Sequence, residues 1–331
     1  MGLVLADTTW PELGKDSKMF TMTKLEPHFL QSPAWAEFQR SIKRRTIDKS
    51  NKEWHYLAIV ERGKIGKRLY CPHGPTVSSK TALKDALKDL REEAKKLKLD
   101  FLRIEPTGNI TRQDLIDLGL RPSHRNVNPA DTLINDVSVE PDAIRAQLSQ
   151  TTRRYARKGD KAGLAYSVSY EPCDIKYFLD MIHDVAARTG MKPFSDFYFQ
   201  HIAATLFPIR AAGLLFAELN GKKIASVIFY TDGTTMSYAH AANYSEYRNI
   251  SPATGLGLNA LLFAHDQGCK YFDWFGVAPE GASRDHRWAG FTRFKLSFGG
   301  QRVSTLGTWE MPVRKLRYRT YKTMLKLSGK H

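Results

Sequence analysis

Cysteine is scarce in this chain. Its 331 residues include three cysteines, Cys71, Cys173 and Cys269, which lie far apart, form no CxxC pair and are odd in number. This pattern argues against a disulfide framework or a zinc site and favours a reducing compartment. Cys71 and His73 could begin a metal site, but no second pair follows at ligand spacing, so we expect no metal.

Long uninterrupted apolar runs are also missing. Residues 1–10 lack the charged start and apolar run of a targeting signal, and the most apolar stretch, 202–219, is interrupted by Pro208 and Arg210. With 42% hydrophobic and 25% charged residues, the composition is that of a soluble globular protein long enough for two domains. We therefore expect a cytoplasmic protein.

Acidic residues are too few to balance the basic ones, and the net charge is +16. Much of the excess lies in three basic blocks, within 43–52, 153–161 and 314–330, and the segment 313–331 has no acidic residue. One such block is typical of a solvated helix face. Three together favour a polyanionic partner, which is a nucleic acid, a nucleotide-linked substrate or an anionic lipid surface.

Apolar spacing predicts alternating strands and helices in the first half of the chain. The expected elements are strands at 54–60, 64–70 and 100–105 and helices at 79–97 and 111–118. An Arg62-Gly63 turn joins the first two strands as a hairpin, Ser79 can cap the first helix, and Gly119 closes the second.

The second half begins near Pro141 and predicts a longer version of this order. The expected elements are helices at 142–158, 175–189 and 252–266 and strands at 214–219, 222–230, 235–242 and 270–275. The turns Asn220-Gly221 and Asp232-Gly233 predict an antiparallel meander. A meander followed by a glycine-bearing loop, a helix and a strand is the order of an N-acetyltransferase-like (GNAT-like) α/β fold. Its shorter version in the first half predicts a structural duplication.

The segment 271–300 places one lysine among aromatic residues. A buried strand, 271–275, is followed by loop residues, and Lys295 then follows Phe294 on a short helical stretch. A lysine in apolar surroundings is partly desolvated, so its cation acts strongly on charge that develops nearby. The same pattern is also typical of a lysine whose stem covers apolar surface.

Six motifs, each weak alone, occur in a specific order along the chain. They are FLQSPAWAEFQ at 29–39, LRIEP at 102–106, LSQTTRRYARKGDKAG at 148–163, the stretch 238–252, FDWFG at 272–276 and RFKLSFGG at 293–300. Together they resemble the FemABX family, the aminoacyl-tRNA-dependent peptidyltransferases that build peptidoglycan cross-bridges. The resemblance covers nearly the whole chain from Phe29 onward.

The resemblance implies an α/β (α+β) fold of two tandem GNAT-like domains, at 1–143 and 144–312, with a C-terminal helix, 313–331, packed on the first. No segment has the length and heptad pattern of the helical arm found in some members, so we expect the compact FemX type. Aminoacyl-tRNA is then a co-substrate, with no other cofactor. The implied acceptor is UDP-MurNAc-pentapeptide or lipid II, and a lipid-linked acceptor implies peripheral contact with the inner membrane surface.

The resemblance also assigns the chemistry. Lys295 matches the catalytic lysine of the family, whose ammonium stabilises the oxyanion of ester aminolysis, and Phe294 matches the residue that helps seat the tRNA end. Glu105 matches an acidic residue proposed as a base, although a substrate group or water could take the proton and Glu105 could instead hold a loop. The expected tRNA contacts are Phe294, Arg293, Arg153 and Arg154.

The precursor-binding end departs from the family pattern. Two cations that hold the nucleotide diphosphate in the FemX type are replaced here by Gln39 and Phe194, whereas a tyrosine is kept as Tyr198. This change leaves room for a lipid-linked precursor or a changed binding pose. The expected substrate contacts are Gln39, Lys192, Tyr198, Tyr247 and Arg248.

Two other classes of function stay open. Gly255-Leu256-Gly257 before a helix could surround a pyrophosphate with backbone N–H groups, as in an acyl-CoA-dependent N-acyltransferase, although Pro252 stands where that loop usually has Arg or Gln. A non-catalytic RNA-binding protein could use the basic blocks alone. That second alternative leaves the aromatic setting of Lys295 unexplained.

Overall fold

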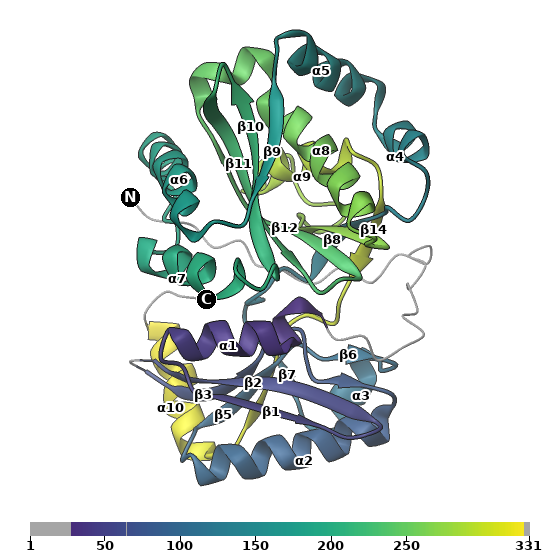
Figure 1. The fold of residues 1–331 in the computed structure, drawn as a ribbon. Helices are drawn as coiled ribbons and strands as arrows, with labels where there is room; N and C mark the ends of the chain where they lie inside the picture. The colour runs from purple at the N-terminus through teal and green to yellow at the C-terminus, as the bar shows by residue number, and fades with distance from the viewer. Residues whose placement is uncertain (1–27, 64, 328–331) are drawn as a thin grey trace. The chain divides into compact units, whose positions relative to one another are not determined.

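The structure, a computed structural model, describes residues 28–63 and 65–327, which fold into two compact units (Figure 1). Of these residues, the first unit contains 28–31, 44–130 and 303–327, and the second contains 32–43 and 131–302. None of the described helices combines the length and the apolar character that a membrane span requires. The expectation for residues 1–10 lies outside the described residues.

The first unit is built around one mixed sheet. Its strands are β1 (Thr46–Ser50), β2 (Trp54–Arg62), β3 (Lys67–Cys71), β4 (Thr76–Val77), β5 (Phe101–Ile104), β6 (Thr107–Gly108), β7 (Arg121–Pro122) and β15 (Trp309–Pro312). They lie in the order β6-β4-β2-β3-β5-β15-β7, and β1 pairs with β2. β2 and β3 form the predicted hairpin, while β3 and β5 pair in parallel. Lys64, the predicted start of the second strand, lies outside the described residues.

Helix α2 (Lys80–Lys96) runs along one face of this sheet (Figure 1). The Ser79 side chain accepts a hydrogen bond from the Ala82 amide and caps the helix, as predicted. Leu83 and Leu87 recur at helical spacing and are buried, so the predicted helix is confirmed. The second predicted helix is α3 (Arg112–Asp117), and η1 (Phe29–Gln31) is a short 3₁₀ helix.

The C-terminal helix α10 (Lys315–Leu327) belongs to the first unit. The rings of Tyr318 and Tyr321 pack on Phe101 of β5, with centroids 5.4 Å and 4.7 Å from the Phe101 ring. Arg103 of β5 donates hydrogen bonds to Glu310 of β15 and, at 2.8 Å, to the Tyr321 hydroxyl. The last helix of the described chain is thereby attached to a strand from its first third, β5. Residues 328–331 of the predicted helix lie outside the described residues.

The second unit contains another mixed sheet. Its strands are β8 (Asp131–Asp136), β9 (Ala165–Ser169), β10 (Ala212–Leu219), β11 (Lys222–Thr231), β12 (Thr235–Asn243), β13 (Tyr271–Gly276) and β14 (Gln301–Ser304). They lie in the order β14-β8-β13-β12-β11-β10-β9. β10, β11 and β12 form the predicted antiparallel meander, and β12 and β13 pair in parallel.

Helices cover both faces of this second sheet. The helices of this unit are α1 (Pro33–Ser41), α4 (Pro141–Gln147), α5 (Gln150–Lys161), α6 (Ile175–Thr189), α7 (Asp196–Leu206), α8 (Pro252–Asp266) and α9 (Ala289–Leu296), with 3₁₀ helices η2 (Pro172–Asp174) and η3 (Ser245–Ile250). Figure 1 shows α6 and α8 on opposite faces of the sheet. The core between α8 and the sheet contains Val227, Phe229 and Trp274, all buried.

Each unit repeats one arrangement, in which an antiparallel pair leads through a helix to a parallel strand. In the first unit this is β2, β3, α2 and β5, and in the second it is β11, β12, α8 and β13. The predicted fold of two tandem GNAT-like units is confirmed.

Two expectations differ from the structure. The predicted single helix at 142–158 is two helices, α4 and α5, because the backbone of Leu148 is extended and the Ser149 side chain caps a new helix. The main part of the second unit begins at Asp131 rather than at 144, because β8 pairs with β13 of the second sheet, and residues 32–43, which include α1, also belong to this unit. For the same kind of reason β15 belongs to the first unit, since it pairs with β5 and β7.

Candidate active site

A cavity opens in the second unit where two parallel strands separate. β12 and β13 pair only from Thr235 to Ser237, and the rest of β12 lines a cavity of about 750 Å³. Ala239 is an extra residue in β12, because Tyr238 faces Phe229 whereas His240 faces Ile228. Such a bulge breaks the ladder and re-aims the side chains that follow it. The other walls come from α6, the segment 191–194, β11, the first turn of α8 and α9.

Lys295 of α9 lies in the wall of this cavity. Its Nζ donates a hydrogen bond to the Gly276 carbonyl at the end of β13, with 2.7 Å between the atoms. Burial lowers the pKa of Lys295 to about 8, although the nearby Asp273 carboxylate favours the charged form. The side chain is therefore mostly protonated at pH 7, and its ammonium is fixed and partly desolvated.

Packing and strain hold the elements around Lys295. Phe294 lies against Trp274 and Phe298, with ring centroids 6.2 Å and 5.0 Å away, which anchors α9 on the core. Phe275 has a φ of 57°, a left-handed conformation that costs energy for a residue with a bulky side chain. The Asp273 carboxylate accepts a hydrogen bond from the Phe275 amide at 2.8 Å and so stabilises this turn. The turn presents the carbonyl that fixes Lys295.

The structure brings three of the predicted site residues to one cavity. Lys295, Phe294 and Lys192 all line it, and so does Phe194, one of the positions where a family cation is replaced. Phe194 stacks on Tyr198 of α7, with ring centroids 4.4 Å apart. The predicted catalytic lysine and some of the positions predicted to bind the precursor therefore lie in the same unit.

The other predicted contacts of the second unit do not line this cavity. Gln39 is buried on α1, Arg293 is exposed on α9, and Arg153 and Arg154 lie on α5. The guanidinium of Arg153 donates to the Ala146 carbonyl at 3.1 Å.

Two further predicted contacts, Tyr247 and Arg248, lie on η3. The Tyr247 hydroxyl accepts a hydrogen bond from Lys222, with 3.1 Å between the atoms. Like the preceding group, these two residues are absent from the cavity lining. Their roles stay predictions.

Glu105 lies in the first unit, just beyond β5, and is buried. Its two carboxylate oxygens accept five hydrogen bonds, from the Tyr70 hydroxyl, the His73 amide, the Asn128 amide, the Asn128 side chain and the Thr308 hydroxyl. A carboxylate surrounded by donors joins the loops that carry them. This geometry favours the loop-holding role over that of a base.

Three cavity residues were missed by the sequence analysis. Phe291 of α9 is 61% exposed at the wall, and Ser226 of β11 is fully buried with a hydroxyl that finds no partner among the described residues. Burial lowers the pKa of His240 to about 4, so this imidazole is neutral at pH 7. Its ring lies 5.2 Å from that of Phe199. The one sequence signal for His240 is that it lies between two alanines of a predicted strand, Ala239 and Ala241.

The glycines that suggested a pyrophosphate loop have another explanation. Gly255 and Gly257 lie inside α8, not in the loop before it. A Cβ on Gly255 would collide with the Tyr166 hydroxyl, and one on Gly257 would lie 2.7 Å from the Phe298 ring. Close packing alone therefore accounts for both glycines.

Comparisons with known proteins agree with this architecture. The model of the FemAB family matches residues 220–326. The crystal structure of FemX is similar over 88% of this chain and 94% of that one, with a TM-score of 0.78 and 16% identity. A domain from Agrobacterium fabrum, described as the C-terminal part of a lysylphosphatidylglycerol synthetase, has a TM-score of 0.58 and 14% identity, with 91% of this chain and 93% of that one covered. No curated protein matches this chain.

The second unit has a GNAT-like fold in which two parallel strands separate beside the lined cavity. The family-model match, which includes Lys295, and the FemX-like fold together support a FemABX-family protein. The resemblance predicted from the sequence motifs is confirmed.

Proposed function

We propose that this chain is an aminoacyltransferase that moves an amino acid from aminoacyl-tRNA to the stem-peptide amine of a peptidoglycan precursor. The observation that carries this proposal is the Lys295 ammonium, fixed in the wall of a cavity of about 750 Å³. The FemAB match over residues 220–326 supports it. Aminoacyl-tRNA acts as the co-substrate, and UDP-MurNAc-pentapeptide or lipid II is the acceptor.

The proposed reaction is the aminolysis of an ester. The acceptor amine attacks the ester carbonyl carbon, a C–N bond forms, and the carbonyl oxygen becomes an oxyanion. Collapse of this intermediate breaks the ester C–O bond, and the ribose oxygen of the released tRNA takes up the proton that the amine loses, directly or through water. Lys295, protonated at pH 7, donates to the oxyanion and lowers its energy.

The cavity walls suit the end of a tRNA. Unpaired bases bind proteins mainly by stacking on aromatic rings, and Phe291 and Phe294 supply such rings beside Lys295. Lys192 is exposed at the wall and can pair with a phosphate. Arg293, next to Phe294 and exposed, is proposed as a further phosphate contact.

Of the predicted precursor contacts, Tyr198, Gln39, Tyr247 and Arg248 do not line the cavity, so we propose indirect or peripheral roles for them. Tyr198 stacks on Phe194, and the Phe38 ring of α1 lies edge-on to the Tyr198 ring, with 5.2 Å between the ring centroids. The proposed role of α1, which also carries the buried Gln39, is to support the wall on the α7 side. Tyr247 and Arg248, outside the cavity lining, would meet only parts of the precursor that extend beyond it.

The test is transfer itself. Purified protein is mixed with aminoacyl-tRNAs and either UDP-MurNAc-pentapeptide or lipid II, and the acceptor is examined by mass spectrometry. We expect a gain of one amino-acid residue with charged tRNA and none with uncharged tRNA. Turnover with acetyl-CoA in place of every charged tRNA would establish the acyl-CoA alternative, and RNA binding without any turnover would establish the non-catalytic one.

The role of Lys295 is tested by Lys295→Met, which keeps the apolar stem and removes the charge. Removing one oxyanion donor typically lowers a rate by roughly a hundred- to thousand-fold, so we expect a loss of that size with nearly unchanged precursor affinity. Lys270→Met is the matched control, because Lys270 is an exposed lysine of the same unit. Full activity of the Lys295 variant would make this lysine structural.

A further inference from the structure

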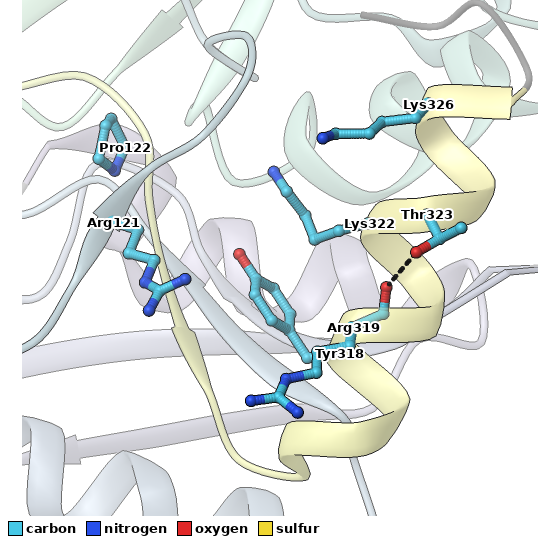
Figure 2. Close-up of a pocket in the computed structure, with 7 residues that line it drawn as sticks. All are labelled: Arg121, Pro122, Tyr318, Arg319, Lys322, Thr323 and Lys326. Carbon is cyan, nitrogen blue, oxygen red and sulfur yellow. Dashed lines mark hydrogen bonds between the residues drawn. The ribbon is translucent and has the colours of Figure 1, made fainter.

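A basic hollow lies on the first unit, whereas the cavity that contains Lys295 belongs to the second. It has a volume of about 490 Å³ and is lined by Arg121 and Pro122 of β7 and by Tyr318, Arg319, Lys322, Thr323 and Lys326 of α10. Figure 2 shows Lys322 and Lys326 extending from α10 toward the side on which Arg121 and Pro122 lie. Four of the seven lining residues are cations.

These cations are poorly neutralised. Lys322 lies 3.9 Å from the Glu310 carboxylate, but that carboxylate already accepts hydrogen bonds from Arg103 and Tyr318. The segment 313–331 supplies no acidic residue. Phosphate is the common biological anion that such a concentration of charge would attract.

The outward face of α10 is apolar as well as basic. Tyr318, Tyr321 and Leu325 are buried on one side of the helix, and on the opposite side Leu316 is 77% exposed and Leu327 is 83% exposed. Leu316, Thr320, Thr323 and Leu327 recur at spacings of four, three and four residues, which places them on one face. A phosphate backbone of RNA offers nothing to two exposed leucines. A lipid surface offers both phosphates and apolar chains.

We propose that the outward face of α10, with the hollow beside Arg121, binds the surface of an anionic phospholipid bilayer. Headgroup phosphates occupy the hollow, while Leu316 and Leu327 enter the boundary of the acyl chains, as in helices that lie in the plane of a membrane. The inference concerns a surface that the proposed transfer reaction does not use, so each stands without the other. Its consequence would be to hold the protein where lipid-linked acceptors are found.

The test uses the full chain and sedimented vesicles. Phosphatidylcholine vesicles are compared with vesicles that also contain phosphatidylglycerol, and we expect binding only to the latter. Each cation near an anionic surface contributes roughly a five-fold factor, so Arg319→Ser with Lys326→Ser should weaken partitioning roughly 25-fold. Leu316→Ser with Leu327→Ser leaves the charge unchanged and should still weaken partitioning by at least roughly a hundred-fold, because two buried apolar side chains are lost.

A matched control removes two charges elsewhere on the same unit. Lys84 and Lys88 are exposed on α2. Because salt screens charges that lie outside the binding face, Lys84→Ser with Lys88→Ser should change vesicle binding by less than about three-fold. All four α10 residues are exposed, so thermal unfolding should be unchanged in the variants. An equal loss in the control, or a leucine variant that binds vesicles normally, would overturn the proposal. So would a loss of tRNA binding, rather than vesicle binding, in the Arg319 and Lys326 variant.

Discussion

At the scale of single residues, Lys295 is a charged side chain kept in a partly desolvated position. Its pKa of about 8 lies below the value of about 10.4 for an exposed lysine, because burial disfavours the ammonium. Between these two pH values the unfolded chain binds more protons at this position than the folded chain does. The contribution of Lys295 to the free energy of unfolding therefore rises from about pH 8 to about pH 10.4, and its full cost is present below pH 8.

Lys295→Met should consequently stabilise the protein at pH 7. We expect a gain of about 1 kcal/mol in the free energy of unfolding, after a discount for the partial exposure of this side chain to solvent, and a gain that shrinks toward zero by about pH 10. Urea unfolding of both proteins at the two pH values measures this. A variant that is less stable than the wild type at pH 7 would mean that the bond from Nζ to Gly276 serves the fold rather than the chemistry.

At the scale of elements, one buried ion pair links two strands of the first sheet and holds α10 through two tyrosine hydroxyls. Arg103 and Glu310 lie on neighbouring strands, and the Tyr321 and Tyr318 hydroxyls complete the network from α10. Arg103→Met leaves the fully buried Glu310 carboxylate without its main partner, so we expect a loss of roughly 3–5 kcal/mol in the free energy of unfolding. The double variant with Glu310→Gln should lose clearly less, because no buried charge remains. Urea unfolding compares the two, and equal losses would show that the charge itself is not the cause.

Local signals allowed most elements to be predicted, and pairing explains those that were missed. Helix spacing from Ser79 onward and the Asn220-Gly221 turn act within a few residues, so the sequence was sufficient to predict them. β8 and β15 are short strands whose partners lie more than 100 residues away, and nothing local marks them. The break between α4 and α5 depends on one capping serine, Ser149, inside a stretch that otherwise continues as a helix.

Some residues of the candidate site could be predicted from the sequence and others could not. Lys295 and Phe294 stood out because aromatic neighbours and the family motif coincide. His240 and Ser226 did not, because the bulge at Ala239 decides which side chains of β12 and β11 reach the cavity. A one-residue shift of this kind exchanges the two faces of a strand and leaves no trace in composition.

At the scale of the whole molecule, two of the three basic blocks lie on different kinds of surface. The block on α5 is exposed and polar, whereas the block on α10 borders exposed leucines. The two should therefore respond differently to RNA, although both are basic. The placement of the charges therefore predicts a difference in RNA binding between the two blocks, which the net charge alone does not.

The salt dependence of tRNA binding separates the two blocks. Each phosphate contact releases counterions, so the logarithm of the binding constant falls with the logarithm of the salt concentration, by about 0.9 per contact on B-DNA and about 0.7 on single strands. Arg154→Ser with Arg157→Ser, two exposed residues of α5, should make this slope shallower by about 2. Arg319→Ser with Lys326→Ser on α10 removes the same charge and should leave the slope unchanged. Fluorescence anisotropy of labelled tRNA over a series of salt concentrations measures both, and equal slopes in the two variants would mean that net charge, not its placement, governs the binding of RNA.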